Sequence, residues 1–162
     1  MKSWRYKLHG SEFTITRLHE GPPPCAHPDT LDCADTAAAY LRQQLATALT
    51  YRPDVENLMV VHLTTKLKPI GFEVVSTGTI DTLLIDPRAI FRSAIVTNSA
   101  AIILAHNHPS GDPTPSDADI KVTRDLIRAG QLLKISVHDH LILGHNTHKS
   151  LREQRSEEHT SE

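Results

Sequence analysis

The feature that most constrains the fold is a short, wholly apolar run that ends at a histidine. Residues 100–105 read Ala-Ala-Ile-Ile-Leu-Ala, and His106 follows directly. A run of this length is too short for a helix and is typical of a central strand buried on both faces. Residues 107–115 contain three prolines and one glycine, which indicates a loop. The run therefore predicts a sheet with helices packed on it.

The rest of the pattern predicts helices and strands in alternation around that strand. We expect a β-hairpin over residues 3–18, helices over 35–49, 86–98 and 116–130, and strands over 55–65, 70–76, 82–85 and 136–143. Helical spacing of apolar residues defines a buried stripe that includes Ile95 in the second helix and Ile120 in the third. Asp86-Pro87 and Ser116 are helix starts, and Gly130 is a helix stop. The predicted fold class is α/β (α+β), a mixed sheet flanked by helices.

The domain organisation follows from length and from the prolines. A chain of 162 residues has the size of one globular domain. We expect an N-terminal hairpin and Pro-rich linker over residues 1–34, a single domain over 35–151, and a polar, frayed tail over 152–162.

Composition excludes several classes of function. A net charge of −2 and 4% aromatic residues argue against a dedicated nucleic-acid binder. The chain has no apolar stretch long enough to span a membrane and no signal peptide at its start, so we expect a cytoplasmic protein. Cys25 and Cys33 form no CxxC pair, which excludes a zinc ribbon and favours free thiols.

The residues after the apolar run predict a metal site. His106 and His108 are two positions apart in extended chain, so both imidazoles lie on one face. Asp119 falls in the first turn of the helix that Ser116 begins, and the proline-stiffened loop can fold it back to the histidines. Two histidines and one carboxylate leave a fourth position for water, as in catalytic zinc sites. Ser116 with Asp119 is also a plain capping arrangement.

The chain has eleven histidines, and the others receive ordinary interpretations. His138 and His140 also lie two positions apart, but they alternate with Val137 and Leu141. We therefore place them on the polar face of an ordinary strand rather than at the metal.

The motif His106-x-His108, seven residues, Ser116, two residues, Asp119 resembles the JAMM (MPN-plus) motif. Four neighbouring segments resemble the JAB domain of the RadC family: Ser76-Thr77-Gly78-Thr79, Pro87-Arg88, residues 101–112 and Asp139-His140. The resemblance covers residues 35–151 and implies a JAB/MPN-like (cytidine-deaminase-like) fold. We find no helix-hairpin-helix module of the kind that often precedes this domain.

The resemblance implies a zinc-dependent hydrolase that cleaves an amide bond in a peptide or protein. His106, His108 and Asp119 would bind Zn²⁺, and Ser116 would contact the water or the developing oxyanion. The family also uses a glutamate on an earlier strand as general acid/base. Glu56 precedes the apolar run 58–61 as that glutamate does, and Glu73 on the next strand is the rival. Isopeptide bonds are cleaved by JAMM relatives.

A second function class is a DNA-repair or mobile-element accessory protein of the RadC family, which binds DNA and retains the metal site with little turnover. Lys121, Arg124 and Arg128 would form one basic stripe, and Arg88 and Arg92 another. Solvated helix faces explain both groups equally well, and the acidic net charge does not support nucleic acid as a partner.

Overall fold

The computed structural model describes residues 29–49, 51–78 and 85–154 in full, together with the backbone of residues 2–8 and 11–17. The two N-terminal segments are strands β1 (Lys2–Leu8) and β2 (Ser11–Arg17), which pair antiparallel and confirm the predicted hairpin. The linker, Cys25 and most of the strand predicted over 82–85 lie outside the described residues.

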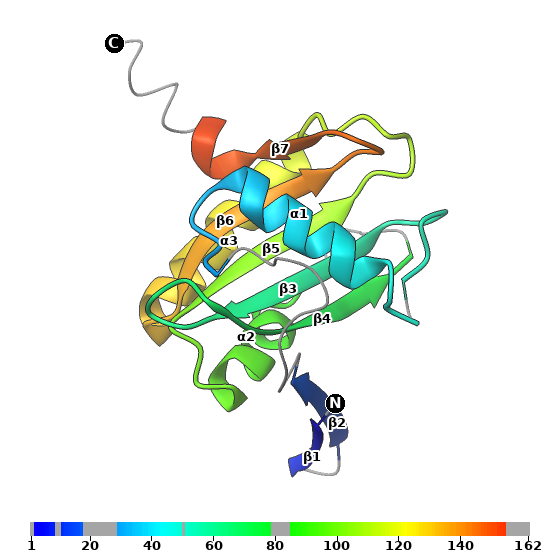
Figure 1. Cartoon of the computed structure of the whole chain (residues 1–162). Coiled ribbons are helices and arrows are strands. Elements are labelled where there is room, and N and C mark those ends of the chain that lie inside the picture. Colours follow the sequence, from blue (N-terminus) through cyan, green and yellow to red (C-terminus); the bar gives the residue numbers. More distant parts are fainter. Residues whose placement is uncertain (1, 9–10, 18–28, 50, 79–84, 155–162) are drawn as a thin grey trace.

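A mixed five-stranded sheet forms the centre of the domain (Figure 1), and it confirms the predicted fold class. Its order is β4-β3-β5-β6-β7, with bounds β3 Asn57–Leu63, β4 Pro69–Thr77, β5 Ala101–Asn107, β6 Ser136–Leu143 and β7 His148–Ser150. Strands β5 and β6 are parallel, and the other neighbours are antiparallel. The sequence pattern did not predict β7.

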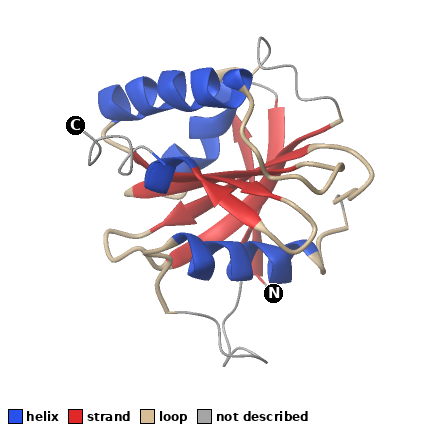
Figure 2. Cartoon of the chain, turned by 90° about the horizontal axis from the view of Figure 1, so that it is seen from above, coloured by secondary structure: helices blue, strands red, loops and turns tan. Residues whose placement is uncertain are grey.

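Helices cover both faces of the sheet (Figure 2), which explains why β5 is buried along its whole length. Helix α1 (Ala34–Leu45) packs on the face that carries Ile103 and Ala105. Helices α2 (Pro87–Val96) and α3 (Asp117–Leu133) pack on the face that carries Ile102 and Leu104. His106 continues the alternation of Ile102 and Leu104 and therefore points towards α3.

Helix ends differ from those expected from apolar spacing. Helix α1 ends at Leu45, and Leu49 is fully exposed. Ile95 is 57% exposed and Ile120 is 41% exposed, so neither belongs to the buried stripe of its helix. Helix α3 continues past Gly130 to Leu133, where Lys134 adopts the left-handed conformation. Leu49, Ile95 and Ile120 all lie outside the two groups of core residues, so apolar spacing alone overestimated the width of each buried stripe.

Gly130 has a packing role rather than the predicted stop role. A Cβ at this position would overlap the carbonyl oxygen of Ile135 and lie 3.2 Å from the Phe91 ring. The absent side chain therefore lets α3 approach both the chain that leads into β6 and helix α2.

Strand β6 contains a bulge that the sequence did not reveal. Val137 pairs with Ile102, but Asp139 pairs with Ile103, so His138 has no partner in β5. Asp139 turns to the α1 face, where it accepts hydrogen bonds from the Ser150 hydroxyl and the Arg152 amide. Residues 151–154 are helical, so the predicted frayed tail does not begin at Arg152.

Among the described residues, no helix combines the length and apolarity that a membrane span requires.

Candidate metal centre

The carboxyl end of β5 holds the first two candidate ligands. Leu58 of β3 pairs with His106, and Ile142 of β6 pairs with it from the other side. Asn107 fixes the next position, because its Oδ1 accepts a 2.9 Å hydrogen bond from the backbone amide of Asn57. The amide of His108 donates to the carbonyl of Leu143 at 2.9 Å. The backbone on both sides of Asn107 is therefore held by the sheet.

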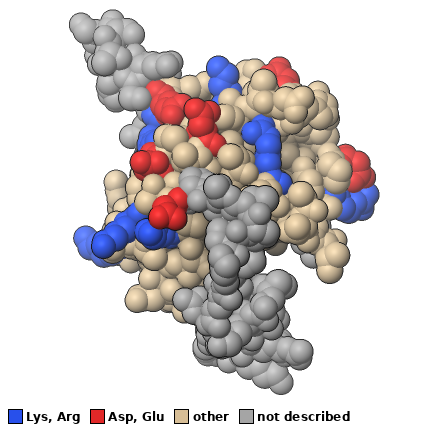
Figure 3. All heavy atoms as spheres, in the orientation of Figure 1, with Lys and Arg blue, Asp and Glu red and all other residues tan. Residues whose placement is uncertain are grey.

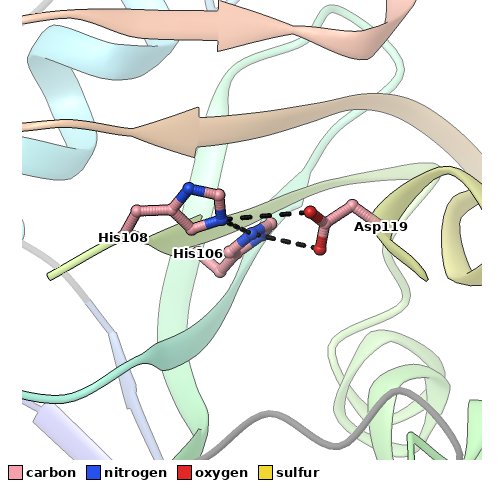
Figure 4. Close-up of side chains that lie close together, drawn as sticks. All are labelled: His106, His108 and Asp119. Carbon is pink, nitrogen blue, oxygen red and sulfur yellow. Dashed lines mark hydrogen bonds and ion pairs between the residues drawn. The ribbon is translucent and has the colours of Figure 1, made fainter. Parts of the chain in front are cut away.

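Three side chains converge at this end of the sheet (Figure 4). The Nε2 atoms of His106 and His108 lie 3.0 Å apart, and Asp119 Oδ1 lies 3.2 Å from His106 Nε2. One ligand atom from each residue falls within a set spanning 4.8 Å, a spacing that could hold a metal ion. His106 and Asp119 are buried, and the His108 side chain is 17% exposed. The predicted trio is thus brought together by the fold.

The His108 ring is oriented from its other nitrogen. His108 Nδ1 lies 2.7 Å from the carbonyl oxygen of Asp112, and a carbonyl can only accept, so Nδ1 carries the proton. The Nε2 atom of neutral His108 then has a lone pair that faces His106. Two imidazole nitrogens and a carboxylate oxygen at this separation can share a proton on His106 Nε2 or coordinate one cation, and two histidines with one carboxylate are a donor set that fits a divalent metal such as zinc.

Asp119 enters the site from the first turn of α3. Ser116 is the N-cap, and its Oγ accepts from the Asp119 amide at 3.2 Å. The Ser116 amide and hydroxyl both donate to Asp119 Oδ2, at 2.8 and 2.6 Å. This capping box leaves Oδ1 directed at His106. The hydroxyl has one proton, so the predicted contact of Ser116 with an oxyanion requires it to leave Asp119; that role stays a prediction.

Burial and hydrogen bonds set the charge of the site. Burial lowers the pKa of His106 to about 4, although the Asp119 carboxylate acts in the opposite sense. Burial would raise the pKa of Asp119, but the hydrogen bonds from Ser116 and the nearby His106 outweigh it and leave that pKa below its usual value. At neutral pH the site therefore contains neutral His106 and an ionised carboxylate, the forms that bind metal.

His140 does not lie on the polar face of an ordinary strand, and that prediction is wrong. The bulge at His138 turns His140 towards α3, where it is 2% exposed. His140 Nε2 lies 2.9 Å from His106 Nδ1, and His140 Nδ1 lies 2.5 Å from Thr123 Oγ1. Burial lowers the pKa of His140 to about 3, so it is neutral at pH 7. The only sequence signal for it was the Asp139-His140 pair within the family resemblance.

The two candidate glutamates have different surroundings. Glu56 is half-buried and precedes Asn57, and its carbonyl accepts from the Gly78 amide at 2.9 Å. Glu73 pairs with Val60, further along the sheet from His106. Its carboxylate accepts a hydrogen bond from the Ser93 hydroxyl of α2 and lies 3.7 Å from His62 Nε2. The backbone at Glu56 therefore lies beside Asn107, the residue between the two histidines, whereas the Glu73 carboxylate is hydrogen-bonded to α2.

A cavity of about 270 Å³ lies beside His108, between α1 and the loops that follow β5 and β6. Arg42, Leu45 and Tyr51 form one side of it, and His108 and His145 the other. Of the three candidate ligands, His108 is the one that lines this cavity.

The comparison with known families agrees with this geometry. A family model described as the RadC-like JAB domain matches residues 31–156, most of the chain. The chain belongs to the RadC-like JAB domain family. The match begins four residues before the domain expected from the sequence and extends five residues beyond it, across the helical turn at residues 151–154.

Similar RadC-like proteins occur in bacteria and archaea. The UPF0758 proteins of Moorella thermoacetica and Desulfitobacterium hafniense are each 52% identical over 100 residues, which is 62% of this chain and 44% of theirs. The UPF0758 protein of Methanococcoides burtonii is 46% identical over 99 residues, 61% of this chain and 43% of its own. The chain thus spans less than half of the length of these relatives.

The basic side chains of this RadC-like JAB domain are interspersed with acidic ones. Arg88 pairs with Asp86 at 2.7 Å, and Arg128 pairs with Asp125 at 3.3 Å. Figure 3 shows acidic and basic groups side by side on the α1 side of the molecule. These pairs reduce the positive potential that a phosphate backbone requires, and DNA binding stays an untested prediction.

Gly111 lies in the loop between His108 and Asp119, and we expect its replacement to lower the unfolding free energy of the domain. Its φ is +84°, and a Cβ would overlap the His145 ring. In Gly111→Ala the left-handed conformation should cost about 1–2 kcal/mol of unfolding free energy, measured by urea denaturation. The double variant Gly111→Ala/His145→Ala removes the overlap but not the backbone cost, so it should remain destabilised relative to His145→Ala. Wild-type stability in Gly111→Ala would contradict this.

Proposed function

We propose that this chain is a zinc-dependent hydrolase of the JAMM type that cleaves an amide bond in a peptide or protein. The observation that carries the proposal is the convergence of His106 Nε2, His108 Nε2 and Asp119 Oδ1 at the carboxyl end of the central strand β5. Three protein ligands with an open position are typical of catalytic rather than structural zinc. Membership of the JAB domain family supports the same reaction class.

The proposed division of roles uses the chain's own side chains. A bound Zn²⁺ would supply an acidified water, with a pKa of about 7, and would polarise the amide carbonyl. Glu56 would accept the proton of the attacking water and deliver it to the leaving amine. We favour Glu56 over Glu73 because Glu56 lies next to Asn57 and Leu58, which contact Asn107 and His106, whereas Glu73 pairs with Val60 further from the ligands.

The substrate class is proposed from the surroundings of the ligands. The cavity beside His108 has apolar walls from Leu45 and Tyr51, and Arg42 is a cation at its edge. Such a space suits one side chain of an extended peptide better than a small metabolite. An isopeptide-linked protein conjugate presents the same extended chain, so both are included in the proposal.

The experiment is a hydrolysis assay of zinc-loaded protein on a library of internally quenched peptides. We expect Glu56→Gln to lower turnover by at least about 100-fold, because general acid/base catalysis contributes roughly 10²–10⁴-fold. Zinc content should stay equimolar, which separates loss of the proton carrier from loss of the metal.

Glu73→Gln is the matched control and should retain turnover. Equal turnover in Glu56→Gln and wild type would overturn the role of Glu56. Equal turnover in wild type and the metal-site variant His106→Ala would overturn the enzyme proposal itself.

A further inference from the structure

A chain of hydrogen bonds leads away from the candidate metal site into α3. His106 Nδ1 contacts His140 Nε2 at 2.9 Å, and His140 Nδ1 contacts the Thr123 hydroxyl at 2.5 Å. The same hydroxyl donates to the backbone carbonyl of Asp119 at 2.6 Å. All members are buried, so water does not compete with these contacts.

The direction of every bond in this chain follows from its last acceptor. A hydroxyl has one proton, and Thr123 donates it to the Asp119 carbonyl, so its oxygen can only accept from His140. His140 therefore carries its proton on Nδ1 and presents a lone pair on Nε2. That lone pair accepts from His106 Nδ1–H, which leaves His106 Nε2 without a proton. Nε2 is the atom that faces Asp119 and His108.

The opposite direction would disable the ligand. If the Thr123 hydroxyl donated to His140 Nδ1, the proton of His140 would move to Nε2 and point at His106 Nδ1. His106 would then carry its own proton on Nε2, between itself and Asp119, where a metal must bind. By accepting the proton of the Thr123 hydroxyl, the Asp119 carbonyl therefore favours the His106 tautomer whose Nε2 has a lone pair available for a metal.

We propose that Thr123 and His140 are positioning residues that fix the tautomer of His106 and thereby set the affinity of the site for its metal ion. Thr123 touches none of the three candidate ligand atoms and can act on them through His140 or through the backbone carbonyl of Asp119; the tautomer of His106 reports only the route through His140. The inference rests on the metal site of the proposed function and is independent of whether that site hydrolyses amides.

The test is Zn²⁺ affinity, measured by competition with a chromophoric chelator, together with the tautomer of His106 in the metal-free protein, measured by long-range ¹H–¹⁵N spectra. Thr123→Val has nearly the same volume and no hydroxyl. We expect it to bind Zn²⁺ up to about 10-fold more weakly, the lower end of the effect of removing a direct partner of a ligand, because Thr123 acts one residue further from the metal. Its His106 should shift towards the form protonated on Nε2. Thr123→Ser should retain wild-type affinity and tautomer.

Thr97→Val is the matched control. The Thr97 hydroxyl donates to the carbonyl four residues earlier in α2, at 2.8 Å, as Thr123 does in α3, but it contacts no histidine. Its loss should leave Zn²⁺ affinity unchanged, which removes the helix bond itself as an explanation.

A second pair of variants keeps the proposal testable if Thr123→Val does not fold. His140→Gln supplies an oxygen acceptor for His106, and His140→Leu supplies none, so His140→Gln should bind Zn²⁺ more tightly. Equal affinity within either pair, with an unchanged His106 tautomer, would overturn the proposal. Zinc binding that responds as described in a protein without peptide hydrolysis would overturn the proposed function and leave this inference standing.

Discussion

Replacing His106 by alanine is expected to abolish stoichiometric metal binding. The His106 ring supplies one of the three candidate ligand atoms, and His106 is more buried than His108. The loss should exceed the 10–100-fold in affinity that removal of a ligand's partner causes, so we expect a reduction of more than about 100-fold. The measurement is zinc content after dialysis against buffer with trace metal, followed by a chelator competition titration.

His148→Ala is the matched control for that variant. His148 lies in β7 of the same sheet, its Nε2 lies 3.3 Å from Asp35 Oδ1, and it is not one of the three candidate ligands. It should retain equimolar zinc. A metal content in His106→Ala equal to that of wild type would show that the ion binds elsewhere, and circular dichroism spectra of both variants establish that the comparison is between folded proteins.

Acid is expected to destabilise the metal-free protein well before the carboxylates titrate. Burial lowers the pKa of His106 to about 4 and that of His140 to about 3, whereas an unfolded histidine titrates near 6.5. Between these values the unfolded chain binds protons that the folded chain does not, so stability is complete above pH 6.5 and falls as the pH is lowered. At pH 5 the loss should be about 2 kcal/mol for each residue.

Urea denaturation at pH 7 and pH 5, in the presence of a chelator, measures this loss. His140→Gln has one fewer buried titrating ring, so its stability should fall by about half as much between the two pH values. A wild-type unfolding free energy that is the same at both pH values would contradict the burial of neutral imidazoles at these two positions.

The candidate ligands could be predicted from the sequence because each depends on local rules. A short apolar run fixes β5, and the period of two then places His106 and His108 on one side. A capping box at Ser116 fixes where Asp119 stands in α3. These patterns act over a few residues, and the structure brings the three side chains together as the pattern indicates.

The surroundings of the ligands could not be predicted in the same way. His140 is 34 residues from its partner His106, and it reaches that partner only because of the bulge at His138. Alternation with Val137 and Leu141 indicated an ordinary strand, and a bulge changes which face each residue takes without any change in composition. The exposure of Ile95 and Ile120 likewise depends on how the helices pack against the sheet, which the spacing of apolar residues in one helix does not determine.

The bulge at His138 allows one strand to meet three different demands. If the same sequence formed a regular strand, Val137 and Asp139 would share a face, and a carboxylate would enter the apolar layer beside α3. With it, Val137 still packs against that layer, Asp139 faces the C-terminal turn, and His140 returns to the side of His106. The polar groups that the bulge redirects, Asp139 and His140, lie in the buried half of β6 next to Leu141 and Ile142. A substitution at either position therefore changes the surroundings of the candidate metal site and the packing of the core together.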